Sequence, residues 1–310
     1  MRNALGRTGL QVSALSFGAS ALGGVFGPVD ELEAIATVHA ALEAGITYFD
    51  VAPAYGGGRA EAVLGKALRG VDRSRYVLST KVGKTTSPTE YGKDTFDYSA
   101  AGIRRSLKES AERLGTDYFD IVHIHDIEYQ QRRYLQQAWT EGVDALLALK
   151  NEGRIGAVSF GIYPMDLWHR IFEELPVDAG LVHNHYCLND TRLLSLLPIA
   201  REKGIGLINA APFASGLLTE RGPADWHPSS ATERAVFRRA ADYCAAHGIS
   251  ISQLAFQFST GHPDIPTTMF STADRTSLQR CLDWFGTEPD EDLVAEVQAI
   301  LSPVRNKDWS

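Results

Sequence analysis

Four ionisable side chains stand at or just beyond the ends of three successive apolar runs in the sequence. Asp50 ends the first run, and Tyr55 follows it in a loop broken by proline and glycine; Lys81 ends the second run and His125 the third. A free tyrosine has a pKa of about 10, too high for easy proton exchange at neutral pH, and a neighbouring ammonium lowers it. A carboxylate keeps that ammonium charged, and a histidine can orient a substrate oxygen. Together the residues predict a general acid/base site that interconverts a carbonyl and an alcohol.

Taken singly, each residue also has a structural explanation, because an aspartate at a strand end often caps a loop and a lysine beside an aspartate is usually a structural ion pair. The four can act together only if the fold brings their strand ends to one place. Strand-type apolar runs alternate with helical patterns, which implies parallel strands joined by helical crossovers. The expected strands lie near Ala14 and at 46–49, 76–80, 119–124, 155–160, 179–183, 205–210 and 265–270, and the expected helices at 59–69, 99–114, 138–152, 166–174, 192–203, 231–247 and 273–285.

Eight strand–helix units in 310 residues fit a closed (β/α)8 TIM barrel, in which chemistry sits at the carboxyl ends of the strands. An open, doubly wound sheet is the alternative, but it usually shows a G-x-G-x-x-G motif after its first strand. The segment Gly18–Gly23 lacks that spacing. We find no domain boundary, so we expect residues 1–310 to form a single barrel domain.

Several segments lie outside the alternating pattern. A small N-terminal hairpin is expected to turn at Thr8-Gly9, and an extra helix follows Asp290 before an irregular tail that starts at Ser302. Asp30 is expected to cap a helix that runs to about Ala44, with one apolar face made of Leu32, Ile35, Val38, Ala41 and Leu42.

Composition limits the class of protein. The net charge of −8 argues against nonspecific nucleic-acid binding, and no run of 18 or more apolar residues predicts a membrane span. The N-terminus lacks the apolar core of a signal peptide. The three cysteines, Cys187, Cys244 and Cys281, are widely spaced and odd in number, which fits a reducing, cytoplasmic setting. We expect a small-molecule enzyme that is a monomer or a weak homo-oligomer.

The four residues resemble the catalytic set of the aldo-keto reductase superfamily, which has an Asp and a Tyr after the second strand, a Lys ending the third and a His ending the fourth. Asp50, Tyr55, Lys81 and His125 match it position by position. The resemblance covers nearly the whole chain, and it includes Leu5–Leu10, Asp50–Gly58 and Gly216–Thr219. It implies an NAD(P)-dependent oxidoreductase acting on CH–OH groups.

Longer stretches resemble one branch of that superfamily, the L-galactose dehydrogenase branch. These stretches are residues 17–28, 123–128, 216–228 and 303–309. The resemblance implies oxidation of an aldose such as L-galactose or L-fucose at C1 to the lactone, with Tyr55 taking the hydroxyl proton and NAD taking the hydride. A substrate pocket is expected to include Phe26, Asp126, Tyr163, Trp226, Asn306 and Trp309.

The resemblance places the coenzyme at the later strand ends, where this sequence departs from the common pattern. The positions that often bind the nicotinamide carboxamide fall on Gly161 and His183, and the position of the stacking tyrosine falls on Ala210. A loop carrying Pro212, Phe213, Ser215 and Leu217 is expected to approach the pyrophosphate. The family positions that often carry a basic residue to bind the 2′-phosphate of NADP fall on Ser271 and Ser277, which favours NAD. NADP stays possible because the same segment contains Arg275 and Arg280.

Other classes of function compete with this interpretation. A carbonyl or aldehyde reductase using NADP, with pyridoxal-type substrates included, would use the same four residues. A metal-dependent barrel hydrolase would instead use the imidazoles of His123, His125, His183 and His185. That hypothesis leaves Tyr55 and Lys81 unexplained, so we expect no metal. A barrel that binds coenzyme as a sensor, without turnover, is a third class.

Overall fold

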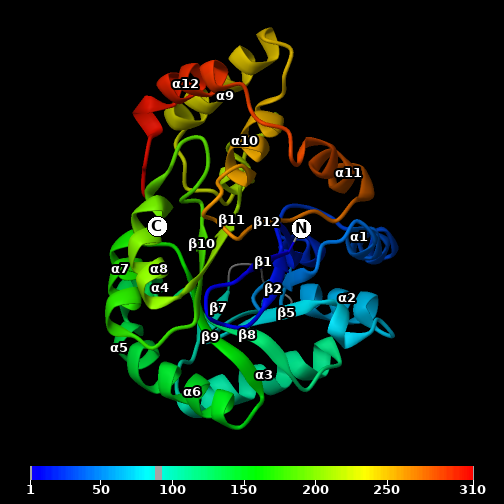
Figure 1. Ribbon diagram of the computed structural model, residues 1–310, viewed down its shortest axis with the longest axis vertical. Helices are drawn as coiled ribbons and strands as arrows, with labels where there is room; N and C mark the ends of the chain where they lie inside the picture. The colour runs from blue at the N-terminus through cyan, green and yellow to red at the C-terminus, as the bar shows by residue number, and fades with distance from the viewer. Residues whose placement is uncertain (1, 88–92, 310) are drawn as a thin grey trace.

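The computed structural model describes residues 2–87 and 93–309. Within these residues, parallel strands form a closed barrel in the order β10-β11-β12-β3-β4-β5-β8-β9 (Figure 1). The barrel confirms the predicted (β/α)8 fold, and the open sheet was the wrong alternative. The strands are β3 (Leu15–Gly18), β4 (Tyr48–Asp50), β5 (Val77–Val82), β8 (Phe119–His125), β9 (Ile155–Ile162), β10 (Ala179–His183), β11 (Gly206–Ala210) and β12 (Thr267–Phe270).

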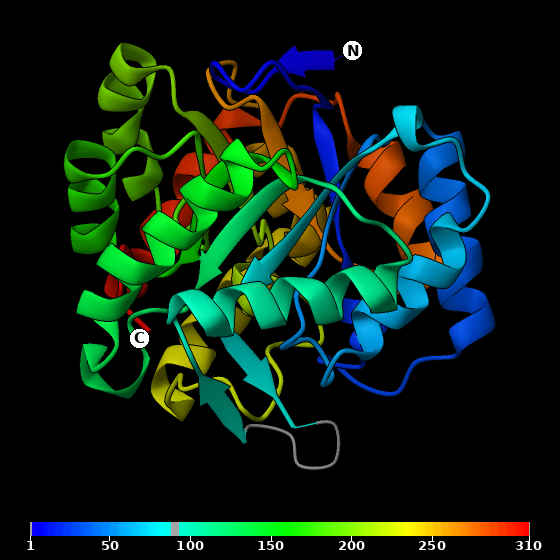
Figure 2. The same ribbon diagram turned by 90° about the horizontal axis from the view of Figure 1, so that it is seen from below.

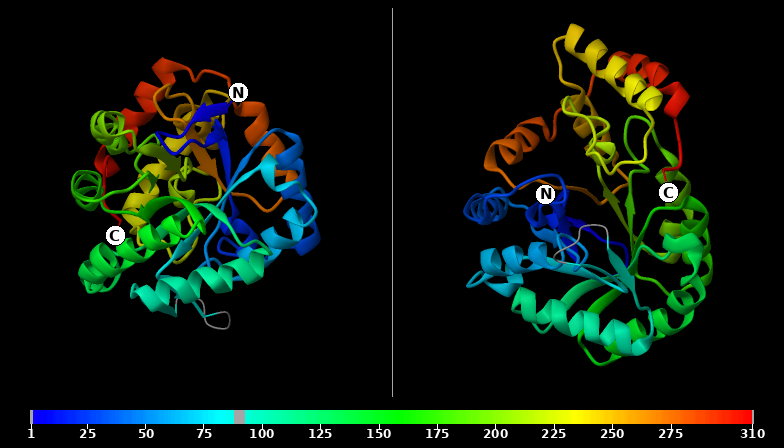
Figure 3. Two further views of the ribbon diagram at one scale, coloured as in Figure 1. Left: turned by 60° about the horizontal axis from the view of Figure 1, so that its bottom comes forward. Right: turned by 180° about the vertical axis from the view of Figure 1, so that it is seen from behind.

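Helices surround the barrel and cover the outer faces of its strands (Figure 3). Asp30 caps α1 as predicted, because its carboxylate accepts a hydrogen bond from Glu33 N at 2.9 Å. The predicted apolar face of α1 is wrong at Leu32, which is 79% exposed. The surrounding helices are α1 (Glu31–Glu43), α2 (Arg59–Leu68), α3 (Ala100–Leu114), α6 (Val143–Asn151), α7 (Met165–Glu174), α8 (Leu197–Lys203), α10 (Ile251–Thr260) and α11 (Arg275–Trp284). In the part of the chain that is described, none of the helices is both long and apolar enough to cross a membrane.

The helix predicted at 231–247 forms, but it does not belong to the ring around the barrel. This helix, α9 (Ala231–Ala246), packs against α12 (Glu291–Ile300) in a second hydrophobic cluster that includes Phe237 and Val297 (Figure 1). The ring position between β11 and β12 is taken by α10, which the sequence analysis missed. A short apolar run such as 251–260 cannot be assigned by periodicity alone, because a buried helix and a buried strand look alike over ten residues.

The predicted N-terminal hairpin forms and closes the bottom of the barrel, with its turn at Gly6-Arg7 rather than at Thr8-Gly9. Its strands, β1 (Arg2–Ala4) and β2 (Gln11–Ser13), pair antiparallel. Leu5 and Val12 are fully buried in one cluster with residues from the barrel strands, among them Tyr48 and Ile121. The bottom of the barrel is therefore packed with apolar side chains, and the polar groups are left for the other end.

A second hairpin, β6 (Lys84–Thr86) with β7 (Asp94–Phe96), follows β5 and stands outside the barrel (Figure 2). It was not predicted, because three-residue strands give too little alternation to recognise. Two short helices, α4 (Tyr129–Arg132) and α5 (Leu135–Gln137), follow β8. Phe96 stacks on Tyr134 at 5.8 Å and contacts Tyr129 at 6.0 Å between ring centroids, which fastens this hairpin to the segment after β8.

Close packing of two backbone segments sets the course of the loop that carries Tyr55. Gly56 has φ +63°, and a Cβ on it would lie 2.1 Å from Gly23 O. Gly23 ends the short helix η1 (Ala19–Gly23), and a Cβ there would lie 2.6 Å from Tyr55 O. Since neither position has room for a side chain, the two glycines allow the loop after β4 to lie directly on η1.

This packing predicts a graded loss of stability. Gly56→Ala should combine the cost of a left-handed conformation, about 1–2 kcal/mol, with an overpacking cost of about 1–3 kcal/mol. Gly9→Ala is the matched control, because Gly9 has φ +79° but nothing within 4 Å of its Cβ position. Urea unfolding of both variants should show the larger loss for Gly56→Ala; equal losses would mean that the contact with Gly23 does not constrain the loop.

Candidate active site

The barrel brings the four predicted residues together at the carboxyl ends of adjacent strands β4, β5 and β8. Lys81 Nζ forms an ion pair with Asp50 Oδ2 and donates to Val51 O at 3.0 Å. The same nitrogen lies 4.8 Å from the centre of the Tyr55 ring. The rings of Tyr55 and His125 meet edge to face, 6.0 Å apart. This is the arrangement that the strand-end positions predicted.

A further shell of buried polar groups fixes Asp50. Ser79 Oγ donates to Asp50 Oδ1 at 2.6 Å, and His123 Nε2 lies 3.4 Å from the same oxygen. The other ring nitrogen of His123 contacts Ser159 Oγ at 2.8 Å. Burial by itself would raise the pKa of Asp50, but Lys81 and His123 together lower it to about 2, so the carboxylate stays ionised. The sequence analysis missed Ser79 and Ser159. Their positions two residues from Lys81 and Gly161, facing the same side of a strand, were the available signal.

Burial governs the charge states of the other three residues. It raises the pKa of Tyr55, because Lys81 lowers that pKa by less than burial raises it. The structure therefore does not show the predicted drop of the tyrosine pKa below its ordinary value. Burial would lower the pKa of Lys81, but Asp50 and Tyr55 outweigh it and raise the pKa. Burial also lowers the pKa of His125 to about 3, which leaves a neutral imidazole at physiological pH. Lys81 is thus an ammonium, and His125 is a neutral hydrogen-bonding group.

The predicted nicotinamide contacts lie at the ends of β9 and β10, next to the four residues. Gly161 packs on the lysine stem, since a Cβ there would be 3.5 Å from Lys81 Cε. His183 ends β10, and burial lowers its pKa to about 4. Asn184, which the sequence analysis missed, adopts φ +63°, and its Nδ2 donates to Ser215 Oγ at 2.9 Å. His183 and Asn184 thus place polar groups at the end of β10, where the sequence predicted the carboxamide contacts.

The loop after β11 has the strained backbone that is common at ligand sites. Ala211, Ala214 and Ser215 all have φ between +47° and +62°, a conformation that costs a residue with a side chain about 1–3 kcal/mol. Phe213 stacks on Phe256 at 5.8 Å, and Leu217 is 2% exposed. Leu217 is therefore a core residue, and Phe213 is half-buried with its ring packed against the barrel core, while Ser215 stays partly exposed.

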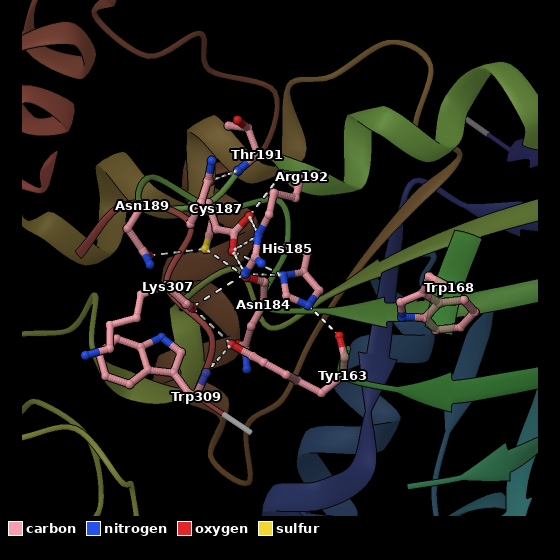
Figure 4. Close-up of polar contacts among 12 residues, drawn as sticks. Tyr163, Trp168, Asn184, His185, Cys187, Asn189, Thr191, Arg192, Lys307 and Trp309 are labelled. Carbon is pink, nitrogen blue, oxygen red and sulfur yellow. Dashed lines mark hydrogen bonds and ion pairs between the residues drawn. The ribbon is translucent and has the colours of Figure 1, made fainter. Parts of the chain in front are cut away.

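The structure separates the predicted substrate residues into two groups. Tyr163 holds the C-terminal tail, because its hydroxyl donates to Lys307 O at 3.5 Å and accepts from Trp309 N at 3.3 Å (Figure 4). Asn306 Oδ1 accepts from Thr191 N at 3.3 Å, so its amide also anchors the tail. Phe26 and Trp226 instead meet across two loops at 6.3 Å between ring centroids, and Trp226 is 45% exposed; Asp126 directly follows His125.

Two of the four histidines proposed for a metal site, His123 and His185, are engaged with protein partners. His123 contacts Asp50 and Ser159, and His185 Nε2 donates to Tyr163 O at 2.5 Å while Nδ1 lies 3.1 Å from Asp190. Over residues 2–87 and 93–309, no group of three or more His, Cys, Asp or Glu side chains is arranged to hold a metal ion. His123 and His185 therefore act as hydrogen-bonding groups within the protein, while buried His125 Nδ1 has no hydrogen-bond partner among the described residues.

The buried ion pair predicts strong coupling between its two members. Lys81→Met or Asp50→Asn leaves one buried charge without its partner, which should cost about 3–5 kcal/mol of unfolding free energy. The double variant removes both charges, so its loss should be well below the sum of the two single losses. Arg104→Ala is the control, since Arg104 and Glu152 pair at 2.5 Å with side chains 44% and 47% exposed, and such pairs contribute about 1 kcal/mol or less. Additive losses for Lys81 and Asp50 would contradict the coupling.

Comparison with known proteins agrees with this geometry. Residues 14–302 match the model of the aldo/keto reductase family. The chain is 41% identical to an L-galactose dehydrogenase of Arabidopsis thaliana, over 99% of this chain and 96% of that protein. It is 31% identical to a pyridoxal 4-dehydrogenase of Microbacterium luteolum, over 94% of each. The fold matches a solved aldo-keto reductase of Bacillus halodurans with a TM-score of 0.76 and 24% identity, over 98% of this chain and 96% of that one. The chain therefore belongs to the aldo/keto reductase family, whose members are oxidoreductases that use a nicotinamide coenzyme.

Proposed function

We propose that this protein is an aldose 1-dehydrogenase, which oxidises C1 of L-galactose, L-fucose or a related sugar to the lactone and uses NAD. The observation that carries the proposal is the juxtaposition of Tyr55, Lys81, Asp50 and His125 in a chain 41% identical to an L-galactose dehydrogenase over 99% of its length. The geometry supplies acid/base chemistry, and the relative suggests the class of substrate. We infer one enzyme domain spanning residues 1–310.

The chain's own residues would divide the proton chemistry among them. A bound, oxidised nicotinamide coenzyme would supply the acceptor for the hydride, which leaves C1 with both electrons of the C1–H bond. Tyr55 takes the proton of the C1 hydroxyl, so the sugar loses one hydride and one proton as the C1–O bond becomes a carbonyl. Lys81 favours the phenolate that receives this proton, and Asp50 keeps Lys81 charged and in place. His125 is neutral and orients the C1 oxygen.

A second candidate is the oxidation or reduction of a pyridoxal-type substrate with the same residues. The 31% identity to a pyridoxal 4-dehydrogenase over 94% of the chain favours it. The two candidates differ in substrate rather than in acid/base chemistry, so a substrate panel separates them.

The decisive experiment measures initial rates for L-galactose, L-fucose, D-arabinose, D-galactose and pyridoxal with each coenzyme. An L-sugar with NAD should give the highest kcat/KM, and the rate should survive treatment with EDTA.

Tyr55→Phe should lower kcat by roughly 10²–10⁴-fold, the usual contribution of a general acid/base. Tyr76→Phe is the control, because Tyr76 lies at the start of β5 beside Phe49, away from the mouth of the barrel. Near-full turnover in Tyr55→Phe would move the acid/base role elsewhere, and a preference for pyridoxal would favour the second candidate.

The preference for NAD rests on the surroundings of the predicted phosphate site. Ser271 Oγ accepts from Ala21 N at 2.9 Å, so it is tied to η1. Arg275 Nε and Nη2 donate to Glu33 at 3.0 and 2.9 Å, and its backbone N also donates to Glu33 at 3.0 Å. Arg275 lowers the pKa of Glu33, which keeps the carboxylate ionised. A 2′-phosphate would have to compete with Glu33 for Arg275 and would meet its negative charge.

This arrangement predicts that Glu33 contributes to coenzyme choice. The wild type should prefer NAD, and Glu33→Gln should raise kcat/KM for NADP by roughly 10–150-fold, the equivalent of one charge-assisted hydrogen bond. The gain should vanish in Glu33→Gln/Arg275→Ala. Arg280, the second arginine of the predicted phosphate segment, donates from Nη2 to Ser277 Oγ at 3.0 Å rather than to Glu33. Arg201→Ala is the control, because Arg201 forms an exposed ion pair with Asp264 at 3.0 Å and has no part in the predicted phosphate site. A wild type that prefers NADP and reverses on Arg275→Ala would contradict the assignment.

A further inference from the structure

Lys84 reaches the site from outside the barrel, on the β6–β7 hairpin. Its side chain is 9% exposed, and its Nζ donates to Asp126 Oδ2 at 2.7 Å. The same nitrogen lies 3.1 Å from Asp94 Oδ2 and 4.0 Å from the centre of the Tyr129 ring. A lysine this buried, with two carboxylates and an aromatic face around it, is held in one position.

Asp126 divides its two oxygens between Lys84 and His125. Oδ2 takes the bond from Lys84, while Oδ1 lies 3.4 Å from His125 Nε2, beyond an ordinary hydrogen bond. The backbone is fixed as well, because Asp126 has φ +51° and Tyr98 donates to the carbonyls of both His125 and Asp126, at 2.6 and 3.1 Å. Oδ1 is therefore presented beside the imidazole that is expected to orient the reacting oxygen.

Lys84 is one of the groups that allow a carboxylate to be ionised at this buried place. Burial raises the pKa of Asp126, and the charges around the carboxylate lower it to about 2. Because His125 is neutral above its own pKa of about 3, Lys84 is the cation that stabilises ionised Asp126 at physiological pH. Glu128 shows the opposite outcome two residues later, where burial and the charge of Asp126 raise its pKa to about 8. Besides Lys84, the titratable groups that interact electrostatically with Asp126 are His125, His183, Glu128, Tyr98, Tyr129 and Tyr55.

We propose that Lys84 is a positioning residue, which holds Asp126 Oδ1 as an acceptor for a substrate hydroxyl beside His125 and so selects sugars over simple alcohols. The inference rests on the proposed function. Because His125 orients the reacting oxygen and Oδ1 lies 3.4 Å from that imidazole, the hydroxyl within reach is one on the carbon next to the reacting carbon. For an aldose oxidised at C1, this is the hydroxyl at C2. A carboxylate accepts such a hydroxyl in a charge-assisted hydrogen bond.

A comparison of L-galactose with 2-deoxy-L-galactose tests the proposal. The wild type should favour L-galactose in kcat/KM by about 10–150-fold, the equivalent of one hydrogen bond to a charged group. Lys84→Met should lose most of this preference through the rate on L-galactose, while the rate on the 2-deoxy sugar stays within a few-fold. Lys84→Arg should keep the preference. Thr85→Val is the matched control, because Thr85 bonds Thr95 across the same hairpin at 2.6 Å without touching Asp126.

The pH profile separates positioning from a merely structural role. Loss of the Lys84 ammonium should raise the pKa of Asp126, so the acid limb of kcat/KM for L-galactose should move to higher pH in Lys84→Met. The same loss raises the pKa of His125, which would shift both sugars equally. A larger shift for L-galactose than for the 2-deoxy sugar supports the proposal. If the wild type oxidises L-galactose but Lys84→Met keeps the preference between the two sugars, the inference fails alone; a wild type inactive on L-galactose overturns the proposed function itself.

Discussion

The ion pair between Lys81 and Asp50 is the interaction on which the rest of the site depends. Their side chains are 1% and 3% exposed, and removing two such charges from water costs several kcal/mol each. The cost is offset because Val51 O accepts from Lys81, while Ser79 donates to Asp50. Only strands paired in this register deliver these partners, since Asp50 lies opposite Ser79 in the ladder between β4 and β5. The strand register of the barrel therefore provides the hydrogen-bond partners that this buried ion pair needs.

Burial has a consequence for Tyr55 that charge counting alone would not give. The ring is close to an ammonium, yet its pKa is raised because desolvation of the phenolate outweighs the attraction of Lys81. In the proposed mechanism, proton exchange at Tyr55 therefore depends strongly on the positive charge of Lys81. Desolvation also lowers the pKa of His125, so burial favours the uncharged form of both the phenol and the imidazole.

The open end of the barrel is built from strained loop starts and from parts added outside the barrel. Asp126, Asn184 and Ala211 follow β8, β10 and β11 directly, and all three have φ between +51° and +63°. Residues in this strained conformation persist only where the surrounding structure fixes them. Each of the three changes the direction of the backbone directly after its strand, at the open end of the barrel. Lys84 of the β6–β7 hairpin and Tyr98, which follows that hairpin, hold Asp126. Asn184 is held by Ser215, and Ala211 N donates to Met269 O at 3.1 Å.

The barrel and the four residues at its mouth could be predicted from the amino-acid sequence, because both follow from local patterns. Apolar runs mark strands, and a polar residue at a strand end must lie at one edge of a parallel barrel. Contacts between residues that are distant in the chain could not be predicted and are seen only in the folded protein. Glu33 and Arg275 are 242 residues apart in the chain, and Tyr163 meets a tail 146 residues away. Lys84 reaches Asp126 from a hairpin whose strands are too short to predict. Since closure of the barrel brings these segments together, no local pattern records which charge each side chain meets.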